Sequence, residues 1–254
     1  MTGVGTVSTE PVEGSAASRL RVRVWPLLVT FSFVLVVGGT AAFAVLWLLS
    51  GETKTTSYVL RGSFNGVQIR VVSGNVEVLG GAQGGVAVRR TARSTFGHGP
   101  IEWRHLVGRR LELESTCPRL VVGACAANYR VAVPDDVPVS VRADHGTISV
   151  EGFRGSASLT TGAGGIFVDR FCGYTLHATA VRGDVSVVTA CSPELLVARS
   201  TSGNVSATLP AGRYRIDASS GGGPAIVRGL TPDPDAPWEI EAHSTSGDVA
   251  VEAP

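Results

Sequence analysis

The chain has 254 residues, with 22 basic and 21 acidic residues and a formal net charge of +1. Because it has no basic excess to neutralise phosphates, this composition argues against a nucleic-acid binder. Aromatic residues make up only 6% of the chain, which leaves few stacking platforms for bases, and the length is sufficient for one domain with a buried core and short appendages.

The N-terminal tail is rich in glycine, serine and threonine. It begins MTGVGTVSTEPVEGSAAS and holds too few large apolar side chains to build a core of its own. Residues 1–23 are therefore predicted to form a disordered leader.

An uncharged apolar segment follows the tail. No charged residue occurs between Arg23 and Glu52, and residues 27–49 read LLVTFSFVLVVGGTAAFAVLWLL. As a helix with a rise of ~1.5 Å per residue, this stretch is about 35 Å long, enough to cross a hydrocarbon core of ~30 Å. Trp25 and Trp47 lie near its ends, where amphipathic rings prefer the membrane interface. We predict a transmembrane signal-anchor helix over residues 24–50.

The flanking charges predict the orientation of this helix. Arg19, Arg21 and Arg23 precede it, and the positive-inside rule then places the leader in the cytoplasm and the rest of the chain outside. The alternative is a signal peptide cleaved after Ala44, since residues 42–44 resemble a small-residue cleavage site. The apolar run continues past that site, which favours retention. Residues 51–57 are predicted to be a linker, and residues 58–254 to form the extracytoplasmic domain.

A short unit recurs in this domain: a glycine, a turn residue, and then alternating apolar positions. Copies begin at Gly74, Gly146, Gly164, Gly183, Gly203 and Gly247, with a degenerate copy near Gly222. The four copies from Gly146 to Gly203 are 18, 19 and 20 residues apart. Alternation at period two predicts strands with one buried face, and glycine followed by Asn, Asp or Gly is typical of turns.

A second strand is predicted between successive copies, over residues 156–160, 174–178, 195–199, 214–218 and 238–242. Two strands in a period of about 19 residues predict an all-β fold, a β-solenoid whose coils stack ~4.8 Å apart around one core. Two inward columns are expected, namely Ile148, Ile166, Val185, Val205 and Val249, and Val150, Val168, Val187, Ala207 and Val251. A β-sandwich is the alternative; the fixed register favours the solenoid. Residues 79–141 interrupt the pattern and are expected to form longer strands with loops, one of them over residues 94–100.

All four cysteines fall in the predicted extracytoplasmic part, where disulfides form. Cys172 and Cys191 each follow a repeat glycine by eight residues. Equal offsets on neighbouring coils place them about one strand spacing apart, within the Cα separation of ~4.4–6.8 Å that a disulfide needs. We predict a Cys172–Cys191 disulfide and, from the remaining pair, Cys117–Cys125. Zinc ligation or a reactive thiol is the alternative, but the chain has no Cys-x-x-Cys and its histidines are scattered, so neither a metal site nor a cofactor is expected.

One carboxylate pair has a spacing that an enzyme uses. Glu151 and Asp169 each lie five residues after a repeat glycine, which places them roughly 5 Å apart, as in a retaining glycosidase. Arg154 and Arg170 are close in sequence, which favours a solvated charged face. Asp184 and Asp248 share another register but are expected about three coils apart, ~14 Å, too far for such a pair.

Several of these motifs together resemble a known family. Val133-Pro134, Asp144-His-Gly-Thr-Ile-Ser-Val150, Thr160-Thr-Gly162 and the Ser-Thr-Ser-Gly-Asn/Asp-Val copies at 200–205 and 244–249 are similar to the bacterial putative-adhesin domain of unknown function. The resemblance covers about residues 58–252. It implies a β-solenoid and a surface location, and it transfers no catalytic residue.

The expected function is therefore that of a membrane-anchored, cell-surface binding or scaffolding protein, not an enzyme. Its expected partners are an envelope protein, a cell-wall polymer or further copies of itself. One alternative is a carbohydrate-active β-helix enzyme that uses Glu151 and Asp169. Another is a membrane-bound envelope sensor, which would need a separate cytoplasmic partner because the leader is too short to fold as an effector domain.

Overall fold

The computed structural model describes residues 17–49, 51–95, 99–118 and 124–254, and within the helix it describes the side chains of residues 29–45. The chain divides into two compact units, the first ending at Ser50 and the second spanning Gly51–Pro254. Each unit is described by itself.

The first unit contains one helix, α1 (Ala17–Leu49). The helix begins inside the predicted leader, so the prediction of disorder is wrong for residues 17–23, where Ala17, Leu20 and three arginines favour helix; residues 1–16 lie outside the described residues. Of the helix predicted over residues 24–50, residues 24–49 lie within α1. Within the described part of the chain, no helical stretch has the length and apolar character that a membrane crossing requires.

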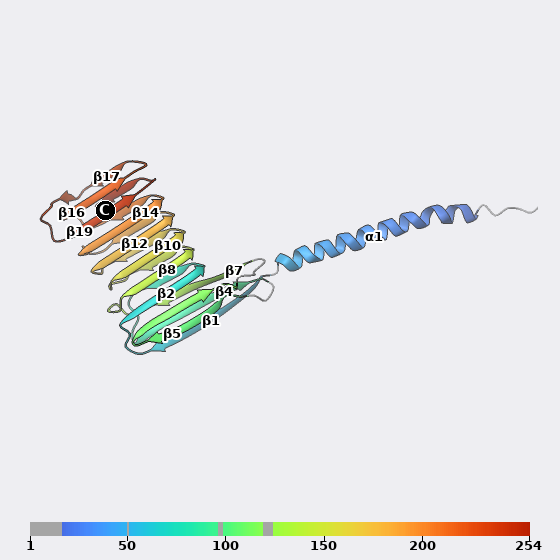
Figure 1. The fold of residues 1–254 in the computed structure, drawn as a ribbon, viewed down its shortest axis with the longest axis horizontal. Coiled ribbons are helices and arrows are strands. Elements are labelled where there is room, and N and C mark those ends of the chain that lie inside the picture. Colours follow the sequence, from blue (N-terminus) through green and yellow to red (C-terminus); the bar gives the residue numbers. More distant parts are fainter. Residues whose placement is uncertain (1–16, 50, 96–98, 119–123) are drawn as a thin grey trace, which may run out of the picture. The chain divides into compact units, whose positions relative to one another are not determined.

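The second unit consists of two ten-stranded sheets (Figure 1). Sheet A contains, in spatial order, β1 (Glu52–Arg61), β4 (Gly85–Ser94), β7 (Cys125–Ala132), β3 (Val76–Leu79), β9 (Ile148–Glu151), β11 (Ile166–Phe171), β13 (Val185–Thr189), β15 (Val205–Thr208), β20 (Val249–Glu252) and β17 (Ala225–Arg228). Sheet B contains β18 (Thr231–Pro232), β16 (Arg213–Ser220), β19 (Glu239–Ser244), β14 (Leu195–Ser202), β12 (Thr175–Arg182), β10 (Ala157–Ala163), β8 (Val139–His145), β2 (Gly66–Ser73), β6 (Arg110–Thr116) and β5 (Ile101–Val107).

From Val139 onward the chain winds in coils that give one strand to each sheet, apart from the additional two-residue strand β18. All strand pairs in this part of the chain are parallel. Both predicted inward columns are confirmed: Ile166 pairs with Ile148 and Val185, and Val205 pairs with Val185 and Val249. Every member of the two columns is at most 2% exposed. Parallel pairing of successive coils gives a β-solenoid-like fold and excludes the antiparallel sandwich.

The second strand of each coil lies where the sequence predicts it. The five predicted segments overlap β10, β12, β14, β16 and β19, and each observed strand continues two to four residues further. The strands are longer because backbone pairing runs on to the next glycine turn. At that turn Gly183 has a φ of +139°, and a Cβ there would lie 2.2 Å from the carbonyl oxygen of Gly164 on the preceding coil. Only glycine allows the coils to stack at this corner.

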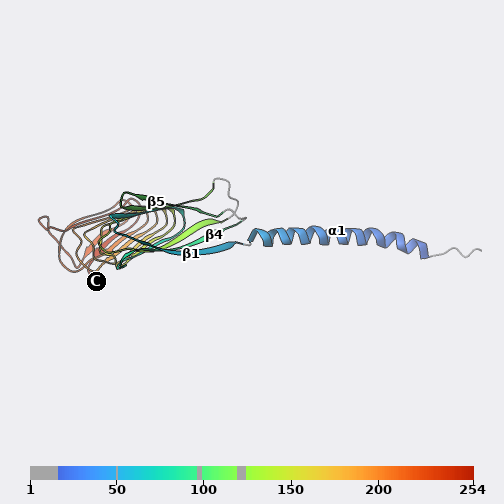
Figure 2. The same cartoon turned by 90° about the horizontal axis from the view of Figure 1, so that it is seen from below.

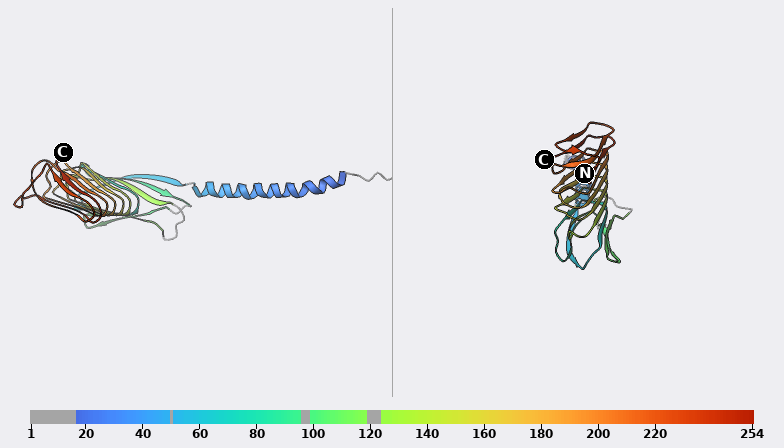
Figure 3. Two further views of the ribbon diagram at one scale, coloured as in Figure 1. Left: turned by 90° about the horizontal axis from the view of Figure 1, so that it is seen from above. Right: turned by 90° about the vertical axis from the view of Figure 1, so that its left-hand side faces the viewer.

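The last two coils do not stack in sequence order. The repeat predicts that the coil with the degenerate copy near Gly222 lies between the coils of Gly203 and Gly247 in the stack, and this prediction is wrong. The final coil, β19 and β20, inserts between β14/β15 and β16/β17, which places Asp184 and Asp248 two coils apart rather than three. Strand β20 buries Val249 and Val251, whereas β17 is largely exposed. The coil with fewer inward apolar side chains therefore lies at the end of the stack, where only the two-residue strand β18 pairs with its outer side. The stacked coils are seen in Figure 3.

At the opposite end three strand pairs are antiparallel. The predicted linker over residues 51–57 is wrong for residues 52–57, because they belong to β1, which pairs along its whole length with β4. Its run of threonines favours strand over a flexible connection. The interrupted stretch forms β4, β5, β6 and β7, with antiparallel pairs β4–β7 and β5–β6. Strands β1 and β4 lie on one side of this end and β5 on the other (Figure 2).

Candidate binding surfaces

The structure brings both predicted cysteine pairs to disulfide distance. The Cα atoms of Cys172 and Cys191 lie 4.7 Å apart, and those of Cys117 and Cys125 lie 6.1 Å apart. The first pair joins two neighbouring coils just after β11 and β13, and the second joins the end of β6 to the start of β7. Each bond therefore fixes a corner of the domain.

The carboxylates of the enzyme hypothesis are neighbours, as their spacing predicts, since Asp169 pairs directly with Glu151. Arg170 contacts both of them: its guanidinium is hydrogen-bonded to Glu151 and lies 3.5 Å from Asp169. The two side chains are 47% and 55% exposed. Both carboxylates are thus paired with a cation on an open surface, an arrangement typical of a solvated charged face.

No group of three or more His, Cys, Asp or Glu side chains among the described residues has a geometry that fits a metal ion. His105 stacks on Trp103 with ring centroids 6.3 Å apart, and His243 lies 3.7 Å from an Asp217 oxygen. These two histidines therefore take part in surface contacts that need no ligand.

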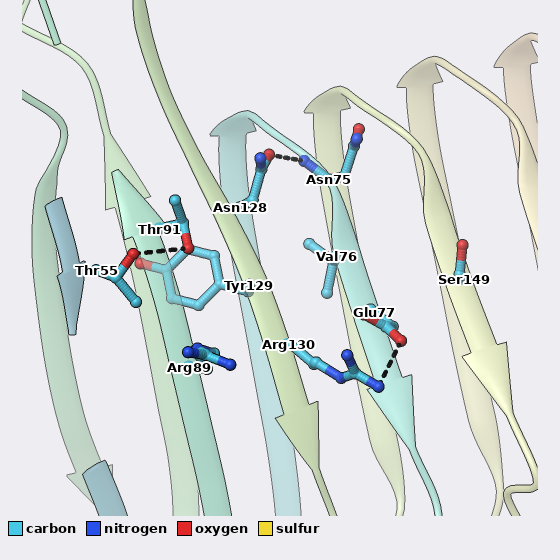
Figure 4. Close-up of a pocket in the computed structure, with 10 residues that line it drawn as sticks. All are labelled: Thr55, Asn75, Val76, Glu77, Arg89, Thr91, Asn128, Tyr129, Arg130 and Ser149. Carbon is cyan, nitrogen blue, oxygen red and sulfur yellow. Dashed lines mark hydrogen bonds and ion pairs between the residues drawn. The ribbon is translucent and has the colours of Figure 1, made fainter. Parts of the chain in front are cut away.

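A shallow pocket of about 580 Å³ lies on the outer face of sheet A, where the antiparallel strands meet the first coils (Figure 4). We call it the sheet A pocket. Its lining residues come from β1, β4, β7, β3, β9 and the turn before β3, and they are Thr55, Asn75, Val76, Glu77, Arg89, Thr91, Asn128, Tyr129, Arg130 and Ser149.

Two arginines dominate the charge of this pocket. Arg89 and Arg130 are opposite one another on β4 and β7. A nitrogen of Arg130 lies 3.4 Å from a Glu77 oxygen on β3. In the part of the chain that the structure describes, no carboxylate pairs with Arg89. The pocket therefore presents one guanidinium that is neutralised and one that is free to bind.

The polar rim of the pocket is held by hydrogen bonds. The Asn75 backbone N–H donates to the side-chain oxygen of Asn128 over 2.9 Å, and the hydroxyls of Thr55 and Thr91 lie 3.4 Å apart. The Asn75 side chain in turn accepts a 2.9 Å bond from the Thr147 N–H on the next coil. These contacts join the antiparallel strands to the coil stack.

A buried polar network lies behind the pocket, between the two sheets. Arg90 donates to the Tyr129 hydroxyl over 3.1 Å and lies 4.0 Å from Glu102 of β5, with both charged side chains nearly buried. The Tyr58 hydroxyl donates to Glu102 over 2.6 Å. Burial is the main cause that raises the pKa of both phenols, and the negative charge of Glu102 raises each further.

Neither the sheet A pocket nor this network follows from the sequence pattern. Arg89, Arg90 and Glu102 lie in the interrupted stretch, where no repeat glycine relates one position to the next. The alternation in residues 85–94 indicates a strand but not the strands beside it. The repeat rule therefore finds the cysteine and carboxylate pairs and misses these residues.

Comparison with known proteins identifies a matching family and several solved structures of low sequence identity. The sequence profile described as Toastrack DUF4097 matches residues 31–226. Among solved structures, a putative cell adhesion protein from Clostridium sporogenes aligns over 80% of this chain and 100% of its own, with 10% identity and a TM-score of 0.48. A putative adhesin from Bacteroides fragilis aligns over 80% and 97%, with 14% identity and a TM-score of 0.45. No curated protein matches the chain at a significant level.

Proposed function

Because the chain belongs to the Toastrack DUF4097 family, we propose that it is an adhesin-like protein whose β domain holds a partner at the cell surface and catalyses no reaction. The observation that carries this proposal is the pair of arginines in the sheet A pocket. One guanidinium is neutralised by Glu77 and the other has no carboxylate partner among the described residues.

The chemistry of the pocket selects an acidic partner. Opposite residues on neighbouring strands stand about 5 Å apart, so Arg89 and Arg130 present their donors side by side. Guanidinium groups form bidentate hydrogen bonds with carboxylates and phosphates. Asn128 and the two threonines add neutral polar groups around them. A carboxylate or phosphate of an envelope partner therefore fits this pocket.

The partner is held, on this proposal, by a rigid surface. The inward side chains of the strands that form the pocket, such as Val78 and Val131, are buried, and Asn75, Asn128 and Thr147 fix its rim. A preorganised site loses less conformational entropy on binding than a flexible one. Such a surface suits binding or scaffolding.

Binding is tested with the purified full-length chain in detergent micelles, immobilised and exposed to polyglutamate, polyphosphate and, as the opposite charge, polylysine. We expect binding to the anionic polymers that weakens with salt. The double variant Arg89→Gln/Arg130→Gln is expected to bind at least about tenfold more weakly. Arg142→Gln, which removes an exposed arginine on β8 outside the pocket, is the matched control. Equal losses in both variants, or no binding to either anionic polymer, would contradict the proposal.

The absence of catalysis is tested separately. Polysaccharides are incubated with the chain, and reducing ends are measured. The proposal predicts no release above the blank, and release that Glu151→Gln or Asp169→Asn abolishes would instead support the enzyme hypothesis.

We also propose that residues 24–50 anchor the chain in a membrane, with the leader in the cytoplasm. The support is the uncharged stretch between Arg23 and Glu52 and the exposure of large apolar side chains on α1, where Phe31, Phe33 and Phe43 are 66–71% exposed. A helix that is apolar all round needs an apolar environment. Protease added to intact cells is expected to digest the β domain and spare an N-terminal tag, while an untreated chain sediments with membranes. Recovery of the full chain in the soluble fraction would contradict the anchor.

A further inference from the structure

A row of three residues stands at the corner where strands of sheet B begin. Tyr174, Glu194 and Trp238 are the residues immediately before β12, β14 and β19. Those strands pair in register, since Thr175 lies opposite Leu195 and Leu195 lies opposite Glu239. The Glu194 N–H donates to the Tyr174 carbonyl over 2.9 Å, and the Glu239 N–H donates to the Glu194 carbonyl over 3.0 Å. The three residues therefore occupy the same position on three successive coils.

These residues line a pocket of about 490 Å³, which we call the corner pocket. Its other lining residues are Cys172, Gly173, Cys191, Ser192 and Pro237. The Cys172–Cys191 bond thus joins two of the three coils that form the pocket. A covalent link at this point keeps the spacing between the coils fixed.

Both aromatic rings are open to solvent. Tyr174 is 72% exposed and Trp238 is 39% exposed. The Trp238 ring packs against the fully buried Tyr214, with ring centroids 6.0 Å apart. The Tyr214 hydroxyl donates to the Pro210 carbonyl over 2.8 Å and lies 2.8 Å from the Ser192 hydroxyl. The Trp238 side of the pocket is therefore supported from the core. Tyr174, in contrast, extends into solvent.

Glu194 supplies the charge of the pocket. It is exposed, and within the described ranges no arginine, lysine or histidine pairs with it. The other surface carboxylates of sheet B near this end are paired: Glu239 with Arg215, and Glu241 with Arg199. Glu194 therefore places an unpaired carboxylate between two exposed aromatic residues.

The arrangement matches one class of ligand. Strands are ~4.8 Å apart, so the two aromatic residues stand about 9.6 Å apart, with the carboxylate midway between them. A cation held by that carboxylate lies between the two rings, within the ~6 Å over which a ring face attracts it. An anion is repelled by Glu194, and a neutral ligand leaves the carboxylate without a counter-charge.

We propose that the corner pocket binds an organic cation, an ammonium or guanidinium group carried by a partner molecule. Tyr174 and Trp238 contact its apolar faces, and Glu194 supplies the counter-charge. This site lies on a different surface from the sheet A pocket, shares no residue with it and selects the opposite charge. The inference therefore goes beyond the proposed function and does not depend on it.

The test uses the purified full-length chain in detergent micelles and pairs of probes that differ only in charge. One pair is a glucosamine oligomer and its N-acetylated form; the other is a lysine-containing peptide and the same peptide acetylated on its lysines. Binding is followed by tryptophan fluorescence and calorimetry. We expect the amines to bind, with a Kd of about 1 mM or tighter, and the acetylated forms to bind at least about tenfold more weakly. The comparison of the two amines shows whether a sugar or a peptide carries the cation.

Three variants locate the site. Tyr174→Ala, Trp238→Ala and Glu194→Gln are each expected to weaken amine binding about tenfold. Trp103→Ala is the matched control, because it removes an exposed tryptophan of β5 that does not line the pocket. Circular dichroism of each variant verifies the fold, and Glu194→Gln keeps the side-chain shape in case Trp238→Ala disturbs Tyr214.

Several results would overturn the proposal. These are equal binding of an amine and its acetylated form, undiminished binding in Glu194→Gln, and no binding of either amine. Failure of the proposed function is distinguishable, because Arg89→Gln/Arg130→Gln removes only the sheet A pocket and is expected to leave amine binding unchanged.

Discussion

The two ends of the β domain hold their strands together in different ways. From Val139 onward the coils are parallel, and the same inward positions repeat, so each coil buries small aliphatic side chains against identical positions above and below. Between Glu52 and Ala132 three strand pairs are antiparallel, and the sheets are joined by the specific network of Tyr58, Arg90 and Glu102. The coil stack depends on backbone repetition, and the antiparallel end depends on individual polar side chains.

The ends also differ in how their edges are protected. At the coil end, β17 and the two-residue β18 close the stack, and Arg213 pairs with Asp233 over 3.3 Å. At the antiparallel end, β1 is a polar edge, whereas β5 exposes Trp103 and Val107 to 53% and 59%. Short or polar edges resist pairing with other chains. The stack of repeated coils therefore ends in a degenerate coil with the short strands β17 and β18, whereas the antiparallel end has one polar edge, β1, and one edge, β5, that exposes apolar side chains.

The largest effect is expected at the glycine corner of the coils. In Gly183→Ala the new Cβ meets the Gly164 carbonyl oxygen at 2.2 Å at a positive φ, so the free energy of unfolding should fall by more than about 4 kcal/mol. Gly108 in the β5–β6 hairpin has a φ of +64° but open space around it, and Gly108→Ala should cost only about 1–2 kcal/mol. Urea unfolding of both variants measures the contrast, and equal losses would show that the coils tolerate displacement.

Removal of the disulfides should have the next largest effect. The Cys172–Cys191 bond spans 19 residues and the Cys117–Cys125 bond spans 8. In the chain-entropy model, replacing both cysteines of a pair by serine costs about 3 kcal/mol for the longer loop and about 2.5 kcal/mol for the shorter one. Thermal unfolding of the two double variants tests this order. A larger loss from the 117–125 pair would mean that the antiparallel end depends more on its crosslink than the coils do.

The network of the antiparallel end should be sensitive to charge removal. Glu102→Gln preserves shape but takes away the charged partner of Arg90 and the strong acceptor for Tyr58, so we expect a loss of about 1.5–3 kcal/mol. Glu241→Gln, which breaks an exposed pair with Arg199 on the coils, should cost at most about 1 kcal/mol. Chemical denaturation compares the two. Similar small losses would show that burial of the network adds little.

The smallest effect concerns alkaline pH. Because burial raises the pKa of Tyr58 and Tyr129 in the folded protein, the unfolded state ionises first, near pH 10. Stability is therefore complete below about pH 10 and falls as the pH rises above it. Tyr58→Phe should reduce this slope, and Tyr174→Phe, at an exposed phenol on the coils, should leave it unchanged. Unfolding curves between about pH 9 and 11.5 measure both slopes.

The sequence predicts the coils well because their periodicity contains the spatial information. Gly164 and Gly183 are one period apart, so residues at equal offsets, such as Cys172 and Cys191, become neighbours on the ladder. The same rule places Asp169 beside Glu151. It fails for residues 52–57, where a threonine-rich strand has no glycine unit, and at the last two coils.

What the sequence by itself determined is therefore the local repeat: the turn glycines, the inward columns and the cysteine register, all of which relate residues about one coil apart. Tertiary structure decided the order of the final coils, the meeting of Arg89 with Arg130, and the position of Trp238 beside Glu194. Val205 pairs with Val249 although the β16/β17 coil lies between them in the sequence. The pair forms because the apolar last coil is buried more completely inside the stack than at its end. Which strand edges meet across such separations depends on the burial of whole coils, a property that no short motif contains.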